Sequence, residues 1–544
     1  MRTGNKVNLL CRTAAGAAAL ILLCTCAAFP AAADKTKTFS DGVVTYEKIT
    51  GGLKIVSVDG STTALHVGRD VDGMPVLSVG ENAFSACSAM TELSFPSGVT
   101  EFENGALYGC TALTALTLPD TLTKIGDGAF AYCSALTELE LPESVTEIGA
   151  YAFSNCSRLT HVTIPGGVKT LNPYTFQGDL LLESVTLPEG LETIDSASFM
   201  NCLVLRELEI PASVKTIGEV AIVACPALQA VRVAEGNENY QSLDDCILTD
   251  RNAETLMLYP GNREITEYTV PDSVKEIAPY AFAYAMSLES LTIPDTVEKI
   301  GAAAFSKCWK LRAVRYPAGI KSIGSSVFAD CTALESFTIP EGVTEIESCA
   351  FLRCSSLNGI TLPASVETVG EYAFAGCSGI RRVDIPETVK AIVNYAFGYD
   401  AEIADDGTIT ATKMKSFTIH GKPKTAAKTY AKSNKLDFDS DGFDPDVLVP
   451  FGIAAAAVLM LIAAALLVYR RRRALDGETS SSENPEPEGD ESEDDPNYVS
   501  ILADDDGEEG DPYDRSYGFQ LTDSGNETSL GNEEKDEPGE FPDD

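Results

Sequence analysis

The sequence predicts an elongated solenoid, in which short repeated units stack and each unit packs only against its neighbours. One phrase returns along the chain: residues 133–153 read CSALTELELPESVTEIGAYAF, and residues 331–351 read CTALESFTIPEGVTEIESCAF. The interval is fixed, because 11 of the 12 gaps between its 13 closing anchor residues equal 23 residues. A period of roughly 20–29 residues with Leu-x-x-Leu-x-Leu wording is typical of a leucine-rich-repeat solenoid. The anchors are Phe84, Leu107, Phe130, Phe153, Phe176, Phe199, Ile222, Phe282, Phe305, Phe328, Phe351, Phe374 and Phe397.

Each repeat has the pattern of one short strand followed by a turn. In the unit that ends at Phe153, leucines alternate with polar residues over 136–141, which predicts a strand with its leucines inward. Pro142 ends the strand because proline cannot donate a ladder hydrogen bond. Val145 and Ile148 continue the inward set, and the spacing that follows predicts one short helical turn. Stacked units therefore form a curved, horseshoe-like α/β fold that is rich in β-structure, with parallel strands ~4.8 Å apart.

The repeat is interrupted once, between Ile222 and Phe282, where successive anchors stand more than two periods apart. We place the insertion at about 234–270. Within it, CILTDRNAETLMLYP predicts two strands about an Asp-Arg-Asn turn. Such an element either corrects the curvature of the stack or protrudes as a binding element. The regular repeats on both sides favour the structural interpretation.

Residues 1–33 have the pattern of a secretory signal peptide. Basic residues open the segment, an apolar run covers 14–29, and small residues precede Asp34. This pattern of charge, length and cleavage site predicts that the mature chain starts at Asp34. Lipid attachment at Cys26 is an alternative, but residues 23–25 are a poor match to the usual small-residue context.

A single membrane span is predicted near the other end of the chain. Residues 447–469 are 23 residues without a charge, which at ~1.5 Å per residue is enough to cross a bilayer core of about 30 Å. Four arginines follow at 470–473, and the positive-inside rule keeps them cytoplasmic, with the repeats outside. The predicted organisation is a signal peptide at 1–33, an N-terminal cap at 34–80, repeats at 81–419, a C-terminal cap and acidic linker at 420–446, a transmembrane helix at 447–469 and a cytoplasmic acidic tail at 470–544.

The charge of the chain divides along the same boundaries. The tail after the arginine block holds 26 acidic residues against Arg515 and Lys535, and it is poor in branched apolar residues. Such a segment buries too little apolar surface to offset the entropy of ordering, so we expect it to be disordered. Residues 1–33 carry +3, the arginine block +4 and the tail −24 of the total net charge of −41, so residues 34–446 carry the remaining −24. This acidity argues against nucleic acid or anionic lipid as a partner of the repeats.

Twelve of the 15 cysteines lie outside the predicted signal peptide, and ten of these follow an anchor by three positions. Equivalent positions of adjacent repeats point the same way, whereas a disulfide needs Cβ atoms about 3.5–4.5 Å apart. A buried ladder of free thiols is therefore favoured over disulfide bonds. Cys246 and Cys349 lie off this ladder. The ladder positions are Cys87, Cys110, Cys133, Cys156, Cys202, Cys225, Cys308, Cys331, Cys354 and Cys377.

Patterns for catalysis are sparse. The chain has three histidines, His66, His161 and His420, in separate segments, and it has no Cys-x-x-Cys pair. Nucleophilic catalysis needs a base beside the nucleophile and a third group that orients the base. We therefore predict no enzyme activity and no cofactor.

One acidic cluster matches the first half of a calcium loop. Asp437, Asp439 and Asp441 begin a D-x-D-x-D-G sequence, and a helix is expected before it at 423–435. Position twelve of such a loop is glutamate, but here it is Leu448, so the bidentate ligand is missing. An acidic spacer between the repeats and the membrane is favoured over a calcium site.

The outward face of the strands is the candidate binding surface. Its positions are short and polar, and a threonine ladder that serves strand packing is an alternative explanation. The face is poor in the aromatic anchors that dominate tight interfaces. Trp309 is the exception, because it replaces the Ser or Thr of many repeats, and it is either exposed or buried beneath the neighbouring turn. The candidate contact residues are Thr117, Glu140, Thr163, Thr186, Glu209, Thr292, Arg315, Thr338, Thr361 and Trp309.

These patterns resemble the BspA-type leucine-rich repeats of bacterial surface proteins, whose units are similar to LTELELPESVTEIGAYAF. The resemblance extends over roughly 40–438 and includes the lead-in VDGMPVLSVGENAF at 71–84 and the closing FTIHGKPKTAAKTYAKSNKLDF at 417–438. Members of the family are secreted or surface-attached, and some are implicated in adhesion to host matrix proteins or to other cells. A solenoid fold hosts many ligands, so the resemblance implies adhesion without identifying a ligand.

We therefore expect a single-pass cell-surface protein whose repeats bind extracellular proteins or glycans. The binding would use many weak contacts, with avidity supplied by neighbouring molecules. Two alternatives remain open: an envelope spacer without a specific ligand, and a receptor that signals through its acidic tail.

Overall fold

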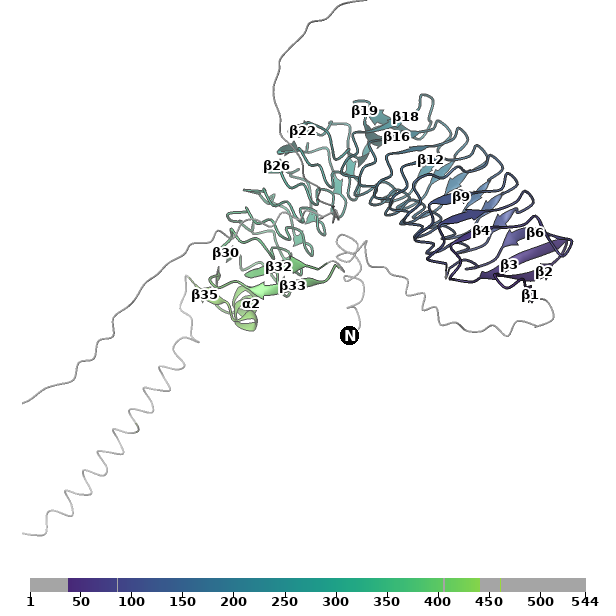
Figure 1. Cartoon of the computed structure of the whole chain (residues 1–544). Helices are drawn as coiled ribbons and strands as arrows, with labels where there is room; N and C mark the ends of the chain where they lie inside the picture. Colours follow the sequence, from purple (N-terminus) through teal and green to yellow (C-terminus); the bar gives the residue numbers. More distant parts are fainter. Residues whose placement is uncertain (1–37, 86, 405–406, 441–459, 461–544) are drawn as a thin grey trace, which may run out of the picture. The chain divides into compact units, whose positions relative to one another are not determined.

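The computed structural model describes residues 38–85, 87–404, 407–440 and Met460. Between residues 38 and 440 these form a stack of repeated coils (Figure 1). The predicted signal peptide, the predicted membrane span apart from Met460, and the acidic tail lie outside the described residues. Within the described part of the chain, no helix has both the length and the apolar character that crossing a membrane requires.

An antiparallel meander of three strands begins the stack. β1 pairs with β2 and β2 with β3 in antiparallel order, and β3 then pairs in parallel with β6. β6 pairs in parallel with β8, so the meander continues directly into the first repeats. Val44, Leu53 and Ile55 are buried and extend the repeat core into the meander. The strands of this region are β1 (Thr38–Ser40), β2 (Val44–Ile49), β3 (Gly52–Val58), β5 (Asp70–Val71) and β6 (Met74–Val79).

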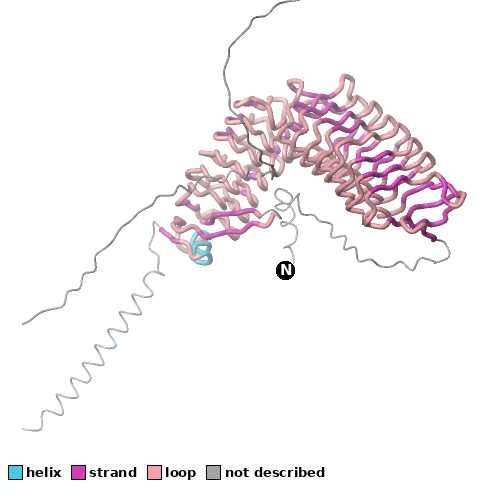
Figure 2. Tube along the Cα trace, viewed as in Figure 1, coloured by secondary structure: helices cyan, strands magenta, loops and turns pink. Residues whose placement is uncertain are grey.

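Repeats contribute short strands to two rows of parallel strands (Figure 2). In the regular repeats, strands of one row pair in register exactly one period apart, with Thr163 opposite Thr186 as an example. The first row is the strand that the sequence predicts. Its members are β4 (Ala64–His66), β7 (Glu92–Ser94), β9 (Ala115–Thr117), β12 (His161–Thr163), β14 (Ser184–Thr186), β16 (Glu207–Ile210), β18 (Ala230–Val233), β22 (Glu267–Thr269), β24 (Ser290–Thr292), β26 (Ala313–Arg315), β30 (Arg382–Ile385), β34 (Thr418–Gly421) and β35 (Asp437–Asp439).

The second row of strands is not predicted by the sequence analysis. Each of its strands is two residues long and packs one apolar side chain against the core, which is buried in most of them and half-buried for Ile217, Ile300 and Ile392. The alternation is therefore too short to give a period-two signal. Its members are β8 (Glu101–Phe102), β10 (Lys124–Ile125), β11 (Glu147–Ile148), β13 (Thr170–Leu171), β15 (Thr193–Ile194), β17 (Thr216–Ile217), β23 (Glu276–Ile277), β25 (Lys299–Ile300), β27 (Ser322–Ile323), β28 (Glu345–Ile346), β29 (Thr368–Val369) and β31 (Ala391–Ile392).

The third side of each repeat is a series of tight turns, and the short helical turn predicted there is wrong. In the unit of Phe153, the amides of Ser154 and Cys156 donate to carbonyls three residues back, at 3.0 and 3.1 Å. The amide of Phe153 itself donates to the carbonyl of Thr175 in the next repeat, at 3.0 Å. An α-helix needs each amide to donate four residues back. The bonds between repeats therefore replace a helix.

These bonds between repeats place left-handed residues two positions before and two positions after the anchor. Around Phe153 they are Tyr151, with φ 57°, and Asn155, with φ 60°. Two residues after the anchor, one repeat has a glycine, Gly109, whereas a later repeat has Ala224, which adopts φ 55°. The left-handed region costs an L-residue other than glycine roughly 1–2 kcal/mol. The turns therefore hold backbone strain wherever glycine is absent.

The phenylalanine anchors form a buried ring stack, which confirms the predicted core. Phe130, Phe153, Phe176 and Phe199 follow one another with ring centroids 5.4–5.6 Å apart and with interplanar angles of 11–18°. All four side chains are fully buried. Each ring therefore fills the space between two successive repeats.

Tyr259 is an anchor that the sequence analysis missed. It precedes Phe282 by one period, and the two rings stack with centroids 4.8 Å apart. Its amide donates to the carbonyl of Ala281 at 2.7 Å, which is the bond that the phenylalanine anchors make. The interruption of the period therefore lies between Ile222 and Tyr259. The stack contains one more regular anchor than the sequence analysis counted, and the extra segment is shorter by one period.

The insertion is a meander of three strands built into the stack. β19 pairs with β20 and β20 with β21 in antiparallel order, which confirms the two strands predicted about the Asp-Arg-Asn turn. β21 then pairs in parallel with β23 of the next repeat. This continuity supports the structural interpretation of the insertion. The strands are β19 (Tyr240–Leu243), β20 (Ile247–Asp250) and β21 (Thr255–Leu258).

The C-terminal end of the stack combines two strands, a hairpin and a helix. β34 and β35 extend the first row beyond β30, and β32 (Tyr399–Ile403) pairs with β33 (Ile409–Lys413) in antiparallel order. α2 (Ala426–Asn434) confirms the helix expected at 423–435. The Tyr430 hydroxyl on α2 donates to the carbonyl of Phe397 at 2.8 Å, so the helix covers the last anchor.

The cysteines form the predicted ladder of free thiols. All 12 cysteines of the described chain are buried, and none of them forms a disulfide bond. Nine of the ten ladder thiols donate to the carbonyl of an anchor 26 residues earlier, with sulfur–oxygen distances of 3.0–3.5 Å. Burial raises the pKa of thiols such as Cys156 and Cys331, so the protonated donor form is favoured. The thiols therefore act as small core residues that also satisfy backbone carbonyls.

Asp179 occupies a ladder position that is cysteine in the neighbouring repeats. It follows Phe176 by three residues, and Cys156 and Cys202 flank it at the same position. Its side chain is fully buried, and neither carboxyl oxygen has a hydrogen-bond partner among the described residues. Burial raises the pKa of Asp179 well above its usual value. In the folded state Asp179 therefore keeps its proton up to a higher pH than an exposed aspartate does.

The variant Asp179→Cys is expected to raise the free energy of unfolding by about 1–3 kcal/mol at neutral pH, because it replaces an unsatisfied buried group with a thiol donor. The folded protein binds a proton at Asp179 that the unfolded chain releases above about pH 3.9, so wild-type stability falls as pH rises from there toward the folded pKa. Urea unfolding across this pH range measures both effects. A wild-type chain and a variant with the same pH dependence would contradict the assignment.

The variant Ala224→Gly is expected to stabilise the protein by up to about 1 kcal/mol, because glycine adopts the left-handed conformation without strain. Thermal unfolding measures the shift in midpoint. Ala112→Gly is the matched control, because Ala112 lies outside the left-handed positions. Glycine at this position should lower the stability of the folded protein. Equal effects from the two variants would show that the turn is not strained.

Candidate ligand-binding surface

The predicted contact residues other than Trp309 share one face of the stack, called here the strand face. It consists of the outward side chains of the first row, and all nine residues are exposed except Thr292, which is half-buried. On assigned strands these are Thr117 (β9), Thr163 (β12), Thr186 (β14), Glu209 (β16), Thr292 (β24) and Arg315 (β26), and Glu140, Thr338 and Thr361 hold the same position in extended segments between strands.

Strand alternation sets this face outward. Val162 and Ile164 flank Thr163 and are buried, so the threonine side chain must point away from the core. The register then repeats the arrangement, with Thr163 opposite Thr186 on adjacent strands. The result is a surface of short polar groups whose spacing is fixed by the backbone.

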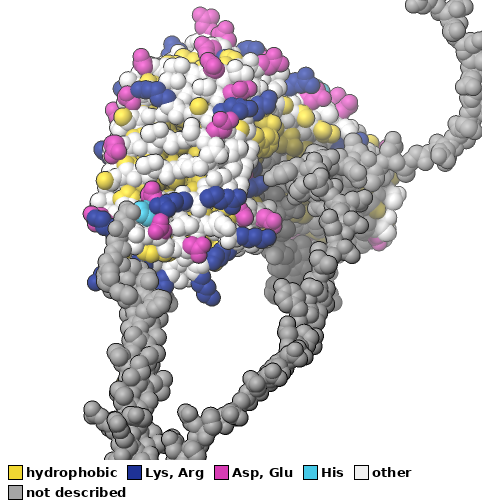
Figure 3. Space-filling model, turned by 90° about the vertical axis from the view of Figure 1, so that its left-hand side faces the viewer, with side chains coloured by type: hydrophobic (Ala, Val, Ile, Leu, Met, Phe, Trp, Pro, Cys, Tyr) yellow, Lys and Arg dark blue, Asp and Glu magenta, His cyan; other side chains and the backbone are white. Residues whose placement is uncertain are grey.

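Acidic side chains neutralise the arginines of the strand face. Arg232 makes a two-pronged contact with Glu207, and this hydrogen bond lowers the pKa of the carboxyl group. Arg315 pairs with Asp295 at 2.9 Å, and the pKa of Asp295 is lowered first by the amide of Ala318 and then by Arg315. Figure 3 shows basic and acidic side chains interspersed on the face in view. The strand face therefore offers a mixed polar surface rather than a single-sign field.

The acidic cluster near the C-terminus does not have the conformation of a calcium loop where it is described. Asp437 and Asp439 lie on β35, and Asp439 pairs with Arg382 of β30 at 2.9 Å. Asp441 lies outside the described residues. Within the described ranges, no group of three or more His, Cys, Asp or Glu residues is placed to hold a metal ion. The acidic spacer that the sequence favours over a calcium site therefore stays a prediction.

The histidines lie apart along the first row of strands. His66 is exposed and contacts Ser94 at 2.8 Å, and His161 is exposed on β12. His420 on β34 lies 3.0 Å from Asp384 of β30, with 14% of its side chain exposed. This arrangement brings no histidine together with a ladder cysteine, because those thiols face the core.

The structure places Trp309 away from the strand face. It lies in the turn that precedes β26, and 43% of its side chain is exposed. Its indole meets Tyr284 of the previous repeat edge to face, with centroids 6.1 Å apart. The sequence allowed Trp309 to be either exposed or buried, and the structure shows that its side chain is exposed.

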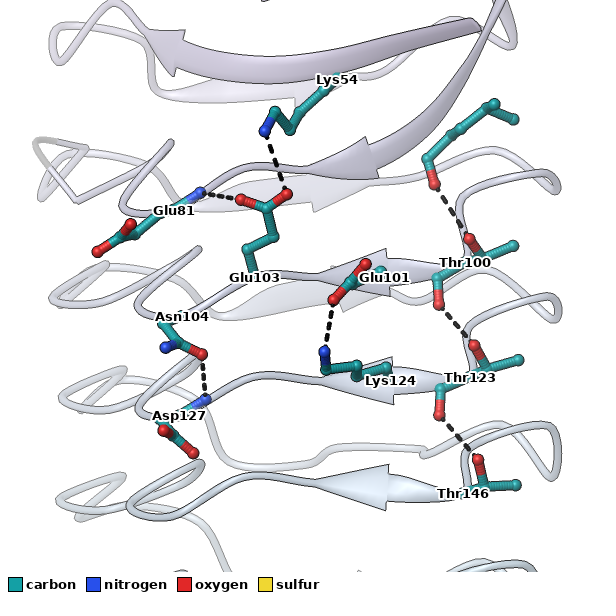
Figure 4. Close-up of polar contacts among 11 residues, drawn as sticks. Lys54, Glu81, Thr100, Glu101, Glu103, Asn104, Thr123, Lys124, Asp127 and Thr146 are labelled. Carbon is teal, nitrogen blue, oxygen red and sulfur yellow. Dashed lines mark hydrogen bonds and ion pairs between the residues drawn. The ribbon is translucent and has the colours of Figure 1, made fainter. Parts of the chain in front are cut away.

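The second row presents another polar face, which sequence analysis did not consider. Figure 4 shows its first repeats, where Lys124 pairs with Glu101 at 2.8 Å across β8 and β10. The hydroxyl of Thr123 donates to the carbonyl of Thr100 at 3.0 Å, and the Asn104 side chain accepts from the amide of Asp127 at 2.9 Å. These side chains hold adjacent repeats together, and exposed ion pairs of this type contribute about 0–1 kcal/mol each.

Comparison with known proteins establishes the family. A model described as the BspA type leucine rich repeat region, built from six repeat copies, matches residues 74–182, 170–273 and 275–404. These matches cover more than half of the chain. The chain belongs to the BspA-type leucine-rich repeat family. The match confirms the resemblance seen in the repeat wording, and it includes the insertion.

Two solved structures are similar to the BspA-type chain. A leucine rich cell surface protein from Faecalibacterium prausnitzii A2-165 is 32% identical, and the match covers 64% of this chain and 94% of that one, with a TM-score of 0.60. The pneumococcal vaccine antigen PcpA is 19% identical over 75% of this chain and 99% of that one, with a TM-score of 0.51. The second likeness concerns the fold alone. No curated protein matches the chain.

Proposed function

We propose that this BspA-type protein is displayed on the cell surface and binds extracellular proteins or glycans through its strand face. The observation that carries the proposal is the strand face itself, where exposed short polar side chains repeat in register over many repeats. The solved relative at 32% identity is a cell surface protein, which supports the location. The predicted signal peptide at 1–33 and the predicted span at 447–469 support anchoring in the membrane.

The chemistry of the strand face favours many weak contacts. Threonine hydroxyls donate and accept hydrogen bonds, and their small size leaves the surface open to a large ligand. Tight interfaces usually depend on a few buried aromatic or arginine residues, and Arg315 is already paired with Asp295. Affinity per molecule is therefore modest, and several copies on one cell supply avidity.

Binding of the purified chain to a panel of matrix proteins, glycans and cell surfaces tests the proposal. A variant with Thr163, Thr186, Thr338 and Thr361 changed to lysine is expected to lose saturable binding at least about tenfold, because long charged side chains displace the ligand from the strand face. Surface plasmon resonance measures the affinity.

The matched control changes four exposed threonines outside the strand face, Thr111, Thr216, Thr296 and Thr388, to lysine. This variant adds the same charge and should keep its affinity. Equal losses in the two variants would assign the effect to charge rather than to the strand face. A folded chain that binds no member of the panel would favour the envelope spacer or the receptor that signals through its tail.

A further inference from the structure

One repeat of this acidic protein is basic. Residues 299–321, which span one period, contain six lysines and arginines and no aspartate or glutamate, whereas residues 34–446 as a whole carry a charge of −24. Neighbouring repeats neutralise three of the six cations. Lys299 pairs with Glu276 at 2.6 Å, Arg312 with Glu335 at 2.7 Å, and Arg315 with Asp295 at 2.9 Å.

Two lysines beside Trp309 have no carboxylate at ion-pair distance among the described residues. Lys310 is exposed and adjoins the indole in sequence. Lys307 lies 5.0 Å from the ring centroid of Tyr284 and donates to its hydroxyl at 2.9 Å. The acid of the next repeat, Asp330, is paired with Arg353 at 3.1 Å. Burial raises the pKa of Asp330, and the charges of Arg353 and Lys307 oppose this rise. We define Tyr284, Lys307, Trp309 and Lys310 as the tryptophan corner.

Packing does not explain the indole at this corner. The position four residues after the anchor is Ser or Thr in many repeats, as at Ser134, Thr332 and Ser355. The Thr332 hydroxyl donates to the backbone carbonyl of Trp309 at 3.5 Å, a bond that any residue at 309 would accept. The indole itself is 43% exposed. A large aromatic side chain is thus held in solvent where a serine would complete the repeat.

We propose that the tryptophan corner binds an anionic glycan, one that carries carboxylate or sulfate groups. A sugar ring presents a face of C–H groups that packs on an exposed indole, while its anionic groups accept charge-assisted hydrogen bonds from the two lysines. An acidic peptide fits less well, since peptide docking uses an unpaired strand edge or a groove. At this corner the backbone is paired on both sides: the Arg312 amide donates to Glu289, and its carbonyl accepts from Glu335.

This site is separate from the strand face and goes beyond the proposed function. It provides a second contact on another side of the repeat, with a ligand of defined charge. The acidity of the rest of the stack limits non-specific attraction of polyanions, so the corner supplies the specificity.

The single tryptophan of the chain reports on the site directly. We expect heparin, added to the full-length chain at low salt, to change Trp309 fluorescence saturably and to protect it from a soluble quencher. High salt should weaken binding, because screening reduces the attraction of exposed charges. Neutral dextran should have no effect. Unchanged fluorescence with heparin, or an equal change with dextran or poly-glutamate, would overturn the proposal.

Two variants remove the exposed side chains without touching the core and should therefore fold. Lys310→Ala is expected to weaken heparin binding a few-fold, as expected for one exposed ion pair, and Trp309→Ser at least about tenfold, as for an aromatic anchor. Affinity electrophoresis in heparin gels measures both. Leu203→Ser is the matched control, because Leu203 holds the same turn position in another repeat with 41% exposure and lacks neighbouring lysines. Retained binding in Trp309→Ser, or an equal loss in Leu203→Ser, would overturn the site, and neither result bears on the strand face.

Discussion

The hydrogen bond from an anchor amide to a backbone carbonyl of the next repeat organises the stack, and the last anchor, Phe397, donates to the Tyr430 hydroxyl instead. Phe153 makes it to Thr175, Phe305 to Val327, and Tyr259 to Ala281. Because the amide must reach the next repeat, the turn cannot become a helix, and left-handed residues appear on both sides of the anchor. The ring stack, the thiol ladder and the two rows of strands follow from the same register. The constant period of the sequence is therefore a geometric requirement of the backbone.

Strong repetition made the solenoid, the buried anchors and the thiol ladder predictable from sequence. The second row was missed because a two-residue strand such as Glu147–Ile148 buries one side chain and shows no alternation. Tyr259 was missed because the anchor position was taken to hold phenylalanine, leucine or isoleucine, although a tyrosine one period before Phe282 was a usable signal. The helical turn was predicted from side-chain spacing, which does not reveal where an amide donates.

The candidate surfaces were predictable to different degrees. The strand face follows from alternation, since Thr163 must point outward when its neighbours are buried. The corner position of Trp309 depends on how the turn enters β26, and this path has no sequence signature. The partners of the charged residues also required the structure, because Arg312 contacts acids in the repeats before and after it. The net charge of a segment does not show which charged side chains pair with each other.

The thiol ladder has a consequence for how such a chain changes length over generations. Nine of the ten ladder thiols bond to the anchor carbonyl of the repeat before, as Cys156 and Cys331 do, and none of the ten forms a disulfide bond. A duplication or deletion of one whole unit therefore leaves no unmatched half of a disulfide, and the register of every other unit is preserved. Genetic recombination between near-identical repeats can lengthen or shorten the stack in steps of one coil while the packing of the other repeats is kept. The length of the stack can therefore change between generations by whole repeats.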